Sequence, residues 1–164
     1  MRILGIDPGY AIVGYGLVEY NNNRFSPLDC GVLTTPQEMP FPKRLKSLYD
    51  SASFLIAENK PDVIAIETLF FNTNVTTAIA VGHARGVLIL AAENAGIPLF
   101  EYTPLQIKQA ITGYGRADKV QMQQMVKILL GLAAVPKPDD AADALAVAIC
   151  HGQSYKMNER TGGR

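Results

Sequence analysis

The sequence predicts an α/β protein built on one five-stranded mixed sheet with helices on both faces. Three strand-like segments come first, and two further strands then alternate with helices. The first pattern is typical of an antiparallel meander, and the second of parallel strands joined by helical crossovers. A chain of 164 residues, of which 48% are hydrophobic, is long enough to bury one core. We expect a single folded domain over residues 1–155 and a basic C-terminal tail over residues 156–164.

The first three strands are separated by residues that favour turns. Asparagines occupy positions 21–23, and asparagine tolerates the left-handed backbone conformation that tight turns need. Short connections of this kind join neighbouring antiparallel strands. The three strands are predicted over residues 2–7, 11–20 and 24–34.

Helical periodicity and capping residues predict the remaining elements. Pro42 suits the first turn of a helix, and apolar residues recur at helical spacing after it. Asn72 or Asn74 can cap the next long helix, and Asp118 with Gln121 resembles a capping box. The predicted elements are helices over 42–59, about 74–96, 103–110, 118–131 and 139–151, with strands over 62–67 and 97–102.

The composition is that of a cytoplasmic protein. The only cysteines, Cys30 and Cys150, do not make a disulfide framework and are predicted to be reduced, buried thiols. No apolar run is long enough to span a membrane, and the N-terminus leads directly into a strand without a secretory signal. We therefore expect a cytoplasmic location and no membrane partner.

The formal net charge of zero leaves a nucleic-acid partner open. The chain has 15 basic and 15 acidic residues, which taken alone argues against a polyanion as partner. If several of the acidic side chains face a bound metal, however, basic residues are in excess over the rest of the molecule. Net charge therefore does not exclude DNA or RNA.

Four carboxylates at separated points of the chain are placed to converge on one metal site. Asp7 and Glu67 each end a short apolar run, and open α/β sheets place their chemistry at the carboxyl ends of strands. Asp140 and Asp143 lie one turn apart on the last predicted helix and share a face. A cluster of hard oxygen ligands suits Mg²⁺ or Mn²⁺ rather than zinc. Two such ions about 4 Å apart can drive hydrolysis of a phosphodiester.

Each of these residues also has a purely structural interpretation. Asp7 begins an Asp-Pro-Gly turn, and Glu67 could simply end its strand. Asp139 or Asp140 could only cap the last helix, and Asp139 is a rival ligand because it too lies one turn from Asp143. Asp143 is harder to explain in this way, since a carboxylate buried in an alanine-rich helix needs a compensating partner such as a cation.

The segments that carry these carboxylates resemble the RuvC family of bacterial Holliday junction resolvases, within the retroviral-integrase and ribonuclease H superfamily. The strand-end aspartate combined with the Asp-Ala-Ala-Asp-Ala helix is specific, whereas Gly-Ile-Asp-Pro-Gly alone also resembles the phosphate loops of actin-like ATPases. The resemblance runs from the first strand to the last helix. The matching segments are residues 5–9, 14–16, 65–67, 84–86, 126–127 with 129–130, and 140–146.

The resemblance implies a ribonuclease H-like fold and a catalytic, metal-binding quartet from which Asp139 is absent. It also implies a homodimer that resolves Holliday junctions in recombination and repair by two symmetric nicks. Two Mg²⁺ ions per active site are expected, with Mn²⁺ able to substitute. A preference for a thymine-containing sequence and cooperation with the RuvA–RuvB branch-migration complex are implied as well. In this chain the quartet falls on Asp7, Glu67, Asp140 and Asp143.

Aromatic and basic residues near the carboxylates are candidate DNA contacts. Phe70 and Phe71 follow the second strand-end carboxylate, where an exposed ring could stack on an unpaired base, although both rings could equally be buried. The resemblance favours Phe70, as a residue that inserts near the junction crossover. Lys108, Arg116 and Lys119 can reach phosphates, and the resemblance places the two lysines near the scissile strand.

The helix predicted over 74–95 carries small residues along one face. Ala78, Gly82 and Gly86 recur at four-residue steps, which lets another backbone approach closely. The partner is either the protein's own sheet or the same helix of a second subunit, and the resemblance implies the second. A two-fold dimer suits a junction that is cut on two strands. Arg85, on the same helix, could bind DNA or form an ion pair.

Three other functions are compatible with parts of this sequence. A nuclease of the same fold could act on another nucleic acid, such as RNA in a hybrid, and a junction-binding module could lack catalysis. The intact quartet argues against the module. An actin-like ATPase fragment is disfavoured because two such lobes do not fit in 164 residues.

Overall fold

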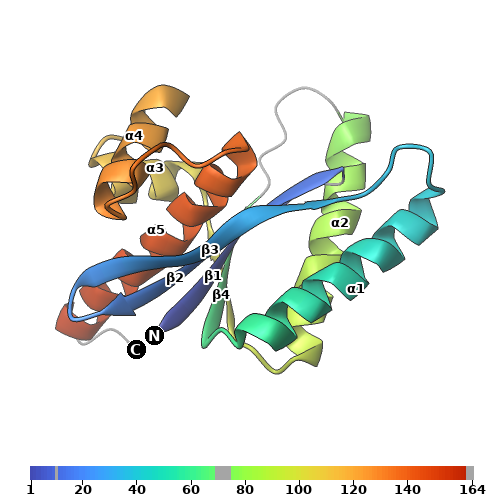
Figure 1. Ribbon diagram of the computed structural model, residues 1–164, viewed down its shortest axis with the longest axis horizontal. Helices are drawn as coiled ribbons and strands as arrows, with labels where there is room; N and C mark the ends of the chain where they lie inside the picture. The colour runs from blue at the N-terminus through green and yellow to red at the C-terminus, as the bar shows by residue number, and fades with distance from the viewer. Residues whose placement is uncertain (10, 69–74, 162–164) are drawn as a thin grey trace.

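A five-stranded sheet runs through the middle of the molecule with helices on both faces (Figure 1). The computed structural model describes residues 1–9, 11–68 and 75–161. The strand order is β3-β2-β1-β4-β5, with antiparallel pairing from β3 to β1 and parallel pairing from β1 to β5. The predicted mixed sheet is confirmed. Its strands are β1 (Arg2–Asp7), β2 (Ile12–Asn21), β3 (Arg24–Thr34), β4 (Val63–Glu67) and β5 (Leu99–Tyr102).

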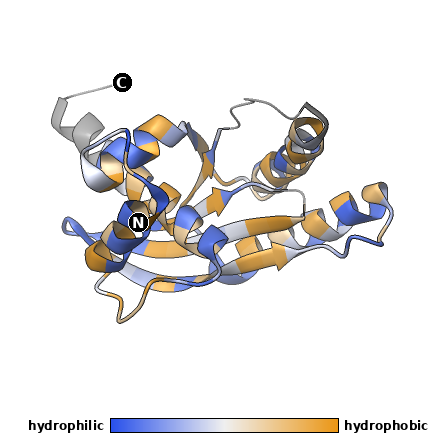
Figure 2. Ribbon diagram, turned by 90° about the horizontal axis from the view of Figure 1, so that it is seen from above, coloured by the Kyte–Doolittle hydropathy of each residue, from blue (hydrophilic) through white to orange (hydrophobic). Residues whose placement is uncertain are grey.

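The helices divide between the two faces and enclose two hydrophobic cores. One core packs α1 and α2 against the sheet, and the other packs α3, α4 and α5 against the opposite face. Figure 2 shows hydrophobic residues along the central strands, and helices around them that carry both hydrophobic and hydrophilic residues. None of the helices in the described ranges has the length and apolar character that crossing a membrane requires. The helices are α1 (Phe41–Asn59), α2 (Val75–Asn94), α3 (Pro104–Thr112), α4 (Lys119–Leu129) and α5 (Asp139–Thr161).

Local signals in the sequence account for several of the element ends. Asp118 and Gln121 form the predicted capping box at the start of α4. Asn22 and Asn23 have positive φ angles of 48° and 63° in the β2–β3 turn, as expected for asparagine in a tight turn. The proposed cap of α2 at Asn72 or Asn74 lies outside the described residues.

Two glycines let α5 lie directly on the backbone of the sheet. A Cβ atom at Gly5 of β1 would overlap the carbonyl oxygen of Ala144, and one at Gly14 of β2 would overlap the carbonyl oxygen of Asp140. Any side chain at these positions would push the helix away. The absence of side chains here therefore brings the acidic first turns of α5 close to the end of β1.

The last helix is longer than predicted. The prediction ended it at residue 151, but α5 continues to Thr161 and includes the first six residues of the predicted tail. Gly152 follows the predicted end but lies inside the helix, where it allows close packing, since a Cβ there would lie 2.5 Å from the Phe25 ring.

The cysteines and one histidine have structural surroundings. Cys30 and Cys150 are free, as predicted, but only Cys150 is buried as predicted, whereas Cys30 is partly exposed. His151 is buried, and its Nδ1 lies 2.8 Å from the Tyr102 hydroxyl oxygen. Burial lowers the pKa of His151 to about 4, so the ring is neutral at physiological pH. The contact between His151 and Tyr102 links α5 to β5 within the core.

Candidate active site

Strand register brings the first two predicted carboxylates side by side. In the parallel β1–β4 pair Ile6 lies opposite Ile66, so the next residue of each strand, Asp7 and Glu67, falls at the same edge of the sheet. The two side chains share a hydrogen bond. This is the carboxyl edge of the parallel strands, where chemistry in such sheets is placed.

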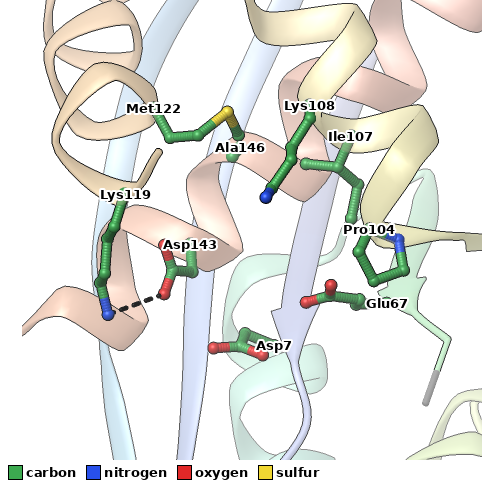
Figure 3. A pocket seen from close by; sticks show the side chains of 9 residues that line it. All are labelled: Asp7, Glu67, Pro104, Ile107, Lys108, Lys119, Met122, Asp143 and Ala146. Atoms are coloured by element: carbon green, nitrogen blue, oxygen red, sulfur yellow. Dashed lines mark ion pairs between the residues drawn. The ribbon is translucent and has the colours of Figure 1, made fainter. Parts of the chain in front are cut away.

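The start of α5 adds the third carboxylate across a cavity of about 230 Å³. Asp143 faces Asp7 and Glu67, as Figure 3 shows. The fourth predicted carboxylate, Asp140, is not part of the cavity wall, but its backbone lies on Gly14, which is opposite Asp7 in the β1–β2 ladder. The cavity is lined by Asp7, Glu67, Pro104, Ile107, Lys108, Lys119, Met122, Asp143 and Ala146.

The electrostatics of the cavity reflect crowded negative charge. Burial, followed by the charges of Glu67, Asp143 and Asp140, raises the pKa of Asp7 to about 7. Burial and the charge of Asp143 also raise the pKa of Glu67, and burial raises that of Asp143. Carboxylates held together out of water favour protonation unless a cation compensates them.

Two lysines approach the carboxylates from α3 and α4. Lys108 points into the cavity (Figure 3), and its charge opposes the rise in the pKa of Glu67. Lys119 Nζ lies 3.5 Å from Asp143 Oδ2 and 3.3 Å from Asp139 Oδ2. Arg116 is exposed in the loop before α4 and does not line the cavity. The structure thus brings two of the three predicted basic residues to the carboxylates.

Asp139 differs from the other acidic residues in its partners. Its Oδ1 accepts a hydrogen bond from Lys137 Nζ over 2.7 Å, in addition to the contact with Lys119. The hydrogen bond from Lys137, supported by Lys119, lowers the pKa of Asp139 to about 2. Asp139 is therefore already neutralised by lysines, whereas Asp7 and Glu67 are crowded by like charges.

The carboxylate oxygens of the cavity are suitable ligands for a divalent cation, although the side chains are not close enough together to coordinate one in this structure. Within residues 1–9, 11–68 and 75–161, no three His, Cys, Asp or Glu side chains form a group that could hold a metal ion as they stand. The cavity nevertheless presents hard carboxylate oxygens, which Mg²⁺ and Mn²⁺ prefer. Binding would require the side chains to move closer together.

The remaining predicted DNA contacts are Phe70, Phe71 and Arg85. Phe70 and Phe71 lie outside the described residues. Arg85 forms an ion pair, one of its two predicted roles, with Nη2 2.7 Å from Glu101 Oε2.

Sequence reasoning missed the apolar wall of the cavity. Pro104 could have been found, because it follows β5 directly at the carboxyl edge of the sheet. Ile107, Met122 and Ala146 carry no signal that distinguishes them from ordinary core residues. Their place in the wall follows only from how α3, α4 and α5 pack together.

Comparisons with known proteins give a consistent family. The family model described as crossover junction endodeoxyribonuclease RuvC matches residues 3–151. Relatives of that name include one from Alkaliphilus oremlandii, 61% identical over 159 residues and 97% of each chain. Another, from Ruminiclostridium cellulolyticum, is 59% identical over 162 residues, covering 99% of this chain and 98% of the relative.

Solved structures agree with the sequence relatives. Thermus thermophilus RuvC in complex with a Holliday junction substrate has a TM-score of 0.91 and 34% identity, covering 96% of both chains. The yeast mitochondrial Holliday junction resolvase has a TM-score of 0.69 at 20% identity, covering 99% of this chain and 82% of that chain, and shows a shared fold. The predicted ribonuclease H-like α/β fold is confirmed. The chain belongs to the RuvC family of crossover junction endodeoxyribonucleases.

Proposed function

We propose that this chain resolves four-way DNA junctions in recombination and repair by two symmetric, metal-dependent phosphodiester nicks. The observation that carries the proposal is the convergence of Asp7, Glu67 and Asp143 on one cavity beside Lys108 and Lys119. Carboxylates supply the ligands for a divalent cation, and lysines supply charge for a phosphate. The solved complex of a 34% identical RuvC with a Holliday junction substrate supports the four-way substrate.

The carboxylates would hold the metal and the lysines would hold the phosphate. Two Mg²⁺ ions, or Mn²⁺ in their place, would activate water and stabilise the leaving oxygen when bound. The apolar wall formed by Ile107 and Met122 limits access of bulk water to one side of the cavity. The proposed catalytic and metal-binding residues are Asp7, Glu67, Asp140 and Asp143.

Lys119 is placed to change partners during the reaction. It contacts both Asp143 and Asp139, and its contact with Asp143 would be released if Asp143 bound a metal. Its ammonium group is then available to the scissile phosphate. Lys108 approaches from the opposite wall, and Arg116, exposed before α4, extends the basic rim toward flanking phosphates.

The metal requirement gives the first test. Mg²⁺ or Mn²⁺ should support cleavage of a synthetic mobile four-way junction, and chelator should abolish it. Ca²⁺ should permit binding but support the reaction poorly, because its looser coordination does not fix the in-line geometry. Duplex DNA and an RNA–DNA hybrid serve as controls. Full activity in excess chelator would contradict the metal-dependent mechanism, and preferential cleavage of the hybrid would point to a different substrate.

Phe70 gives a test of crossover recognition. If its ring stacks on an unpaired base, Phe70→Ala should lose roughly 1–3 kcal/mol of stacking energy. The loss should appear in cleavage of intact junctions and become smaller on substrates already unpaired near the cut. Junction cleavage and thermal unfolding measured together decide the matter, since a lower melting temperature with normal cleavage would identify a core residue.

We propose further that the protein is a homodimer built partly on α2. In the described part of the chain, no heavy atom outside the local backbone lies within 4 Å of a Cβ built at Gly82 or Gly86. Ile79 and Leu90 are also exposed, at 56% and 52%. A helix that is apolar on its outer side as well as its inner side is typical of one that packs against a second protein surface.

Gly82→Leu tests this interface, because it adds bulk where two helices are expected to meet. Overpacking a close contact costs about 1–3 kcal/mol, so sedimentation should show more monomer while each monomer stays folded. Paired resolution should fall more than single nicking, since the two nicks are no longer aligned across the two-fold axis. A variant that stays dimeric and melts earlier would place the stripe inside one subunit.

We infer the cellular setting from family membership. The protein is proposed to act in the cytoplasm with the RuvA–RuvB branch-migration complex, and to prefer a thymine-containing cleavage sequence. Residues 1–155 are proposed as the nuclease domain and residues 156–164 as a basic extension.

A further inference from the structure

Arg85 is a cation inside a largely apolar helix. It is the only lysine or arginine of α2, and its side chain is 17% exposed. A buried guanidinium is costly unless it is paired. Its contacts therefore indicate why a charge is placed here.

Within the described residues, Arg85 contacts the neighbouring strands β4, which carries Glu67, and β5. Its Nε donates a hydrogen bond to the Glu67 backbone carbonyl over 3.3 Å. Its Nη2 lies 2.7 Å from Oε2 of Glu101 in β5. The two groups form an ion pair, but their geometry is not that of a hydrogen bond. The guanidinium thus joins α2 to the end of β4, and the ion pair with Glu101 joins it to β5.

The end of β4 is paired with a strand on one side only, because the β1–β4 ladder ends at Ile66, one residue before Glu67. On the other side Glu67 lies opposite Tyr102 in the β4–β5 ladder, and the N–H of the Glu67–Thr68 peptide donates to the Tyr102 carbonyl over 2.8 Å. The carbonyl of the same peptide accepts the hydrogen bond from Arg85, so β5 holds this peptide on one side and α2 on the other. The direction of the Glu67 carboxylate toward Asp7 depends on the orientation of that peptide.

We propose that Arg85 is a positioning residue, which holds the Glu67 peptide at the end of β4 while Glu101 fixes its guanidinium. This inference rests on the proposed role of Glu67 as a metal ligand. Partners that orient metal ligands typically contribute tenfold to a hundredfold in metal affinity. Loss of Arg85 should therefore weaken metal binding more than it weakens the fold.

Arg85→Met separates positioning from stability. Methionine keeps much of the apolar bulk, and replacing a buried ion pair by an apolar side chain is often neutral for stability. Glu101, half-exposed, is not left as an uncompensated buried charge. Arg85→Lys keeps the charge but not the forked geometry that reaches two acceptors. Glu101→Gln removes only the anchor, and Glu93→Gln removes another exposed carboxylate, near the end of α2, as the matched control.

The experiment measures Mn²⁺ affinity of the DNA-free protein by calorimetry, with melting temperature, sedimentation and junction binding in Ca²⁺ over a range of salt concentrations. Arg85→Met should weaken Mn²⁺ binding by tenfold to a hundredfold, Arg85→Lys should not restore it, and Glu101→Gln should weaken it less. Glu93→Gln, the melting temperature of Arg85→Met and the salt dependence of junction binding should stay unchanged.

Other outcomes overturn the proposal in recognisable ways. Unchanged Mn²⁺ affinity in folded Arg85→Met would leave Arg85 with no positioning role. Weaker junction binding with a salt slope reduced by about 1 would identify a phosphate contact instead. If Arg85→Met does not fold, Glu101→Gln decides, and normal Mn²⁺ affinity there rejects the proposal. Failure of the wild-type protein to bind Mn²⁺ or to cut junctions would instead reject the proposed function itself.

Discussion

Neutralising any one of the four proposed metal ligands is expected to abolish junction cleavage and leave junction binding largely intact. A bound metal supplies several kcal/mol of transition-state stabilisation, so the rate should fall roughly a thousandfold or more. Binding in Ca²⁺ should persist and could even tighten, because each change removes a negative charge near the DNA. The variants are Asp7→Asn, Glu67→Gln, Asp140→Asn and Asp143→Asn.

Asp139→Asn is the matched control on the same helix. Asp139 is paired with Lys137 and Lys119 rather than crowded by other carboxylates, so its neutralisation removes no proposed metal ligand. Most activity should therefore remain. An inactive Asp139→Asn beside an active Asp140→Asn would reverse the assignment of ligands on α5.

Asp7→Asn should also change the thermal stability of the protein, in a direction that follows from the pKa of Asp7. The pKa of Asp7 rises from 3.8 to about 7 on folding, so its charged form is disfavoured in the folded state. Stability is therefore lost as the pH rises between these two values. Asp7→Asn removes this penalty and should raise the melting temperature in chelator at neutral pH. Thermal unfolding at pH 4 and pH 8 measures the effect, which should vanish at the lower pH.

Two of the site residues could be predicted from the sequence, because each ends an apolar run and the two runs are neighbouring strands of the sheet. Asp7 and Glu67 each end an apolar run, and the parallel pairing of β1 with β4 places them together. Spacing could not separate Asp139 from Asp140, because both lie within one turn of Asp143. The resemblance made that choice, and the lysine partners of Asp139 give a physical reason for it.

What the sequence could not predict depends on contacts between distant residues. Arg85 and Glu101 are sixteen positions apart, on different elements, so their ion pair follows only from how α2 packs beside β5. The helix α5 continues past its predicted end at residue 151, and Gly152 lies inside it in close contact with Phe25. The prediction that Phe70 inserts at the crossover stays a prediction.

Gly14→Ala is expected to impair cleavage far more than one added methyl group would suggest. A Cβ at Gly14 would overlap the Asp140 carbonyl oxygen and lie 2.6 Å from its carbon, so the first turn of α5 must move away from β2. Such overpacking costs about 1–3 kcal/mol of folding stability. The same turn carries Asp140 and leads into Asp143, and a displacement of about 1 Å in a catalytic group can cost a hundredfold in rate.

Gly31→Ala on β3 is the matched control for this prediction, since its Cβ would meet the Tyr15 side chain, with the hydroxyl oxygen at 2.9 Å. A side chain can turn aside where a helix backbone cannot, so this variant should lose little activity. Junction cleavage at saturating Mg²⁺, together with thermal unfolding, compares the two glycines. If Gly14→Ala cleaves as fast as Gly31→Ala, the close approach of α5 to β2 is not what sets the position of the α5 carboxylates. A hundredfold difference in rate at similar melting temperatures would show that this glycine serves the geometry of the site more than the stability of the fold.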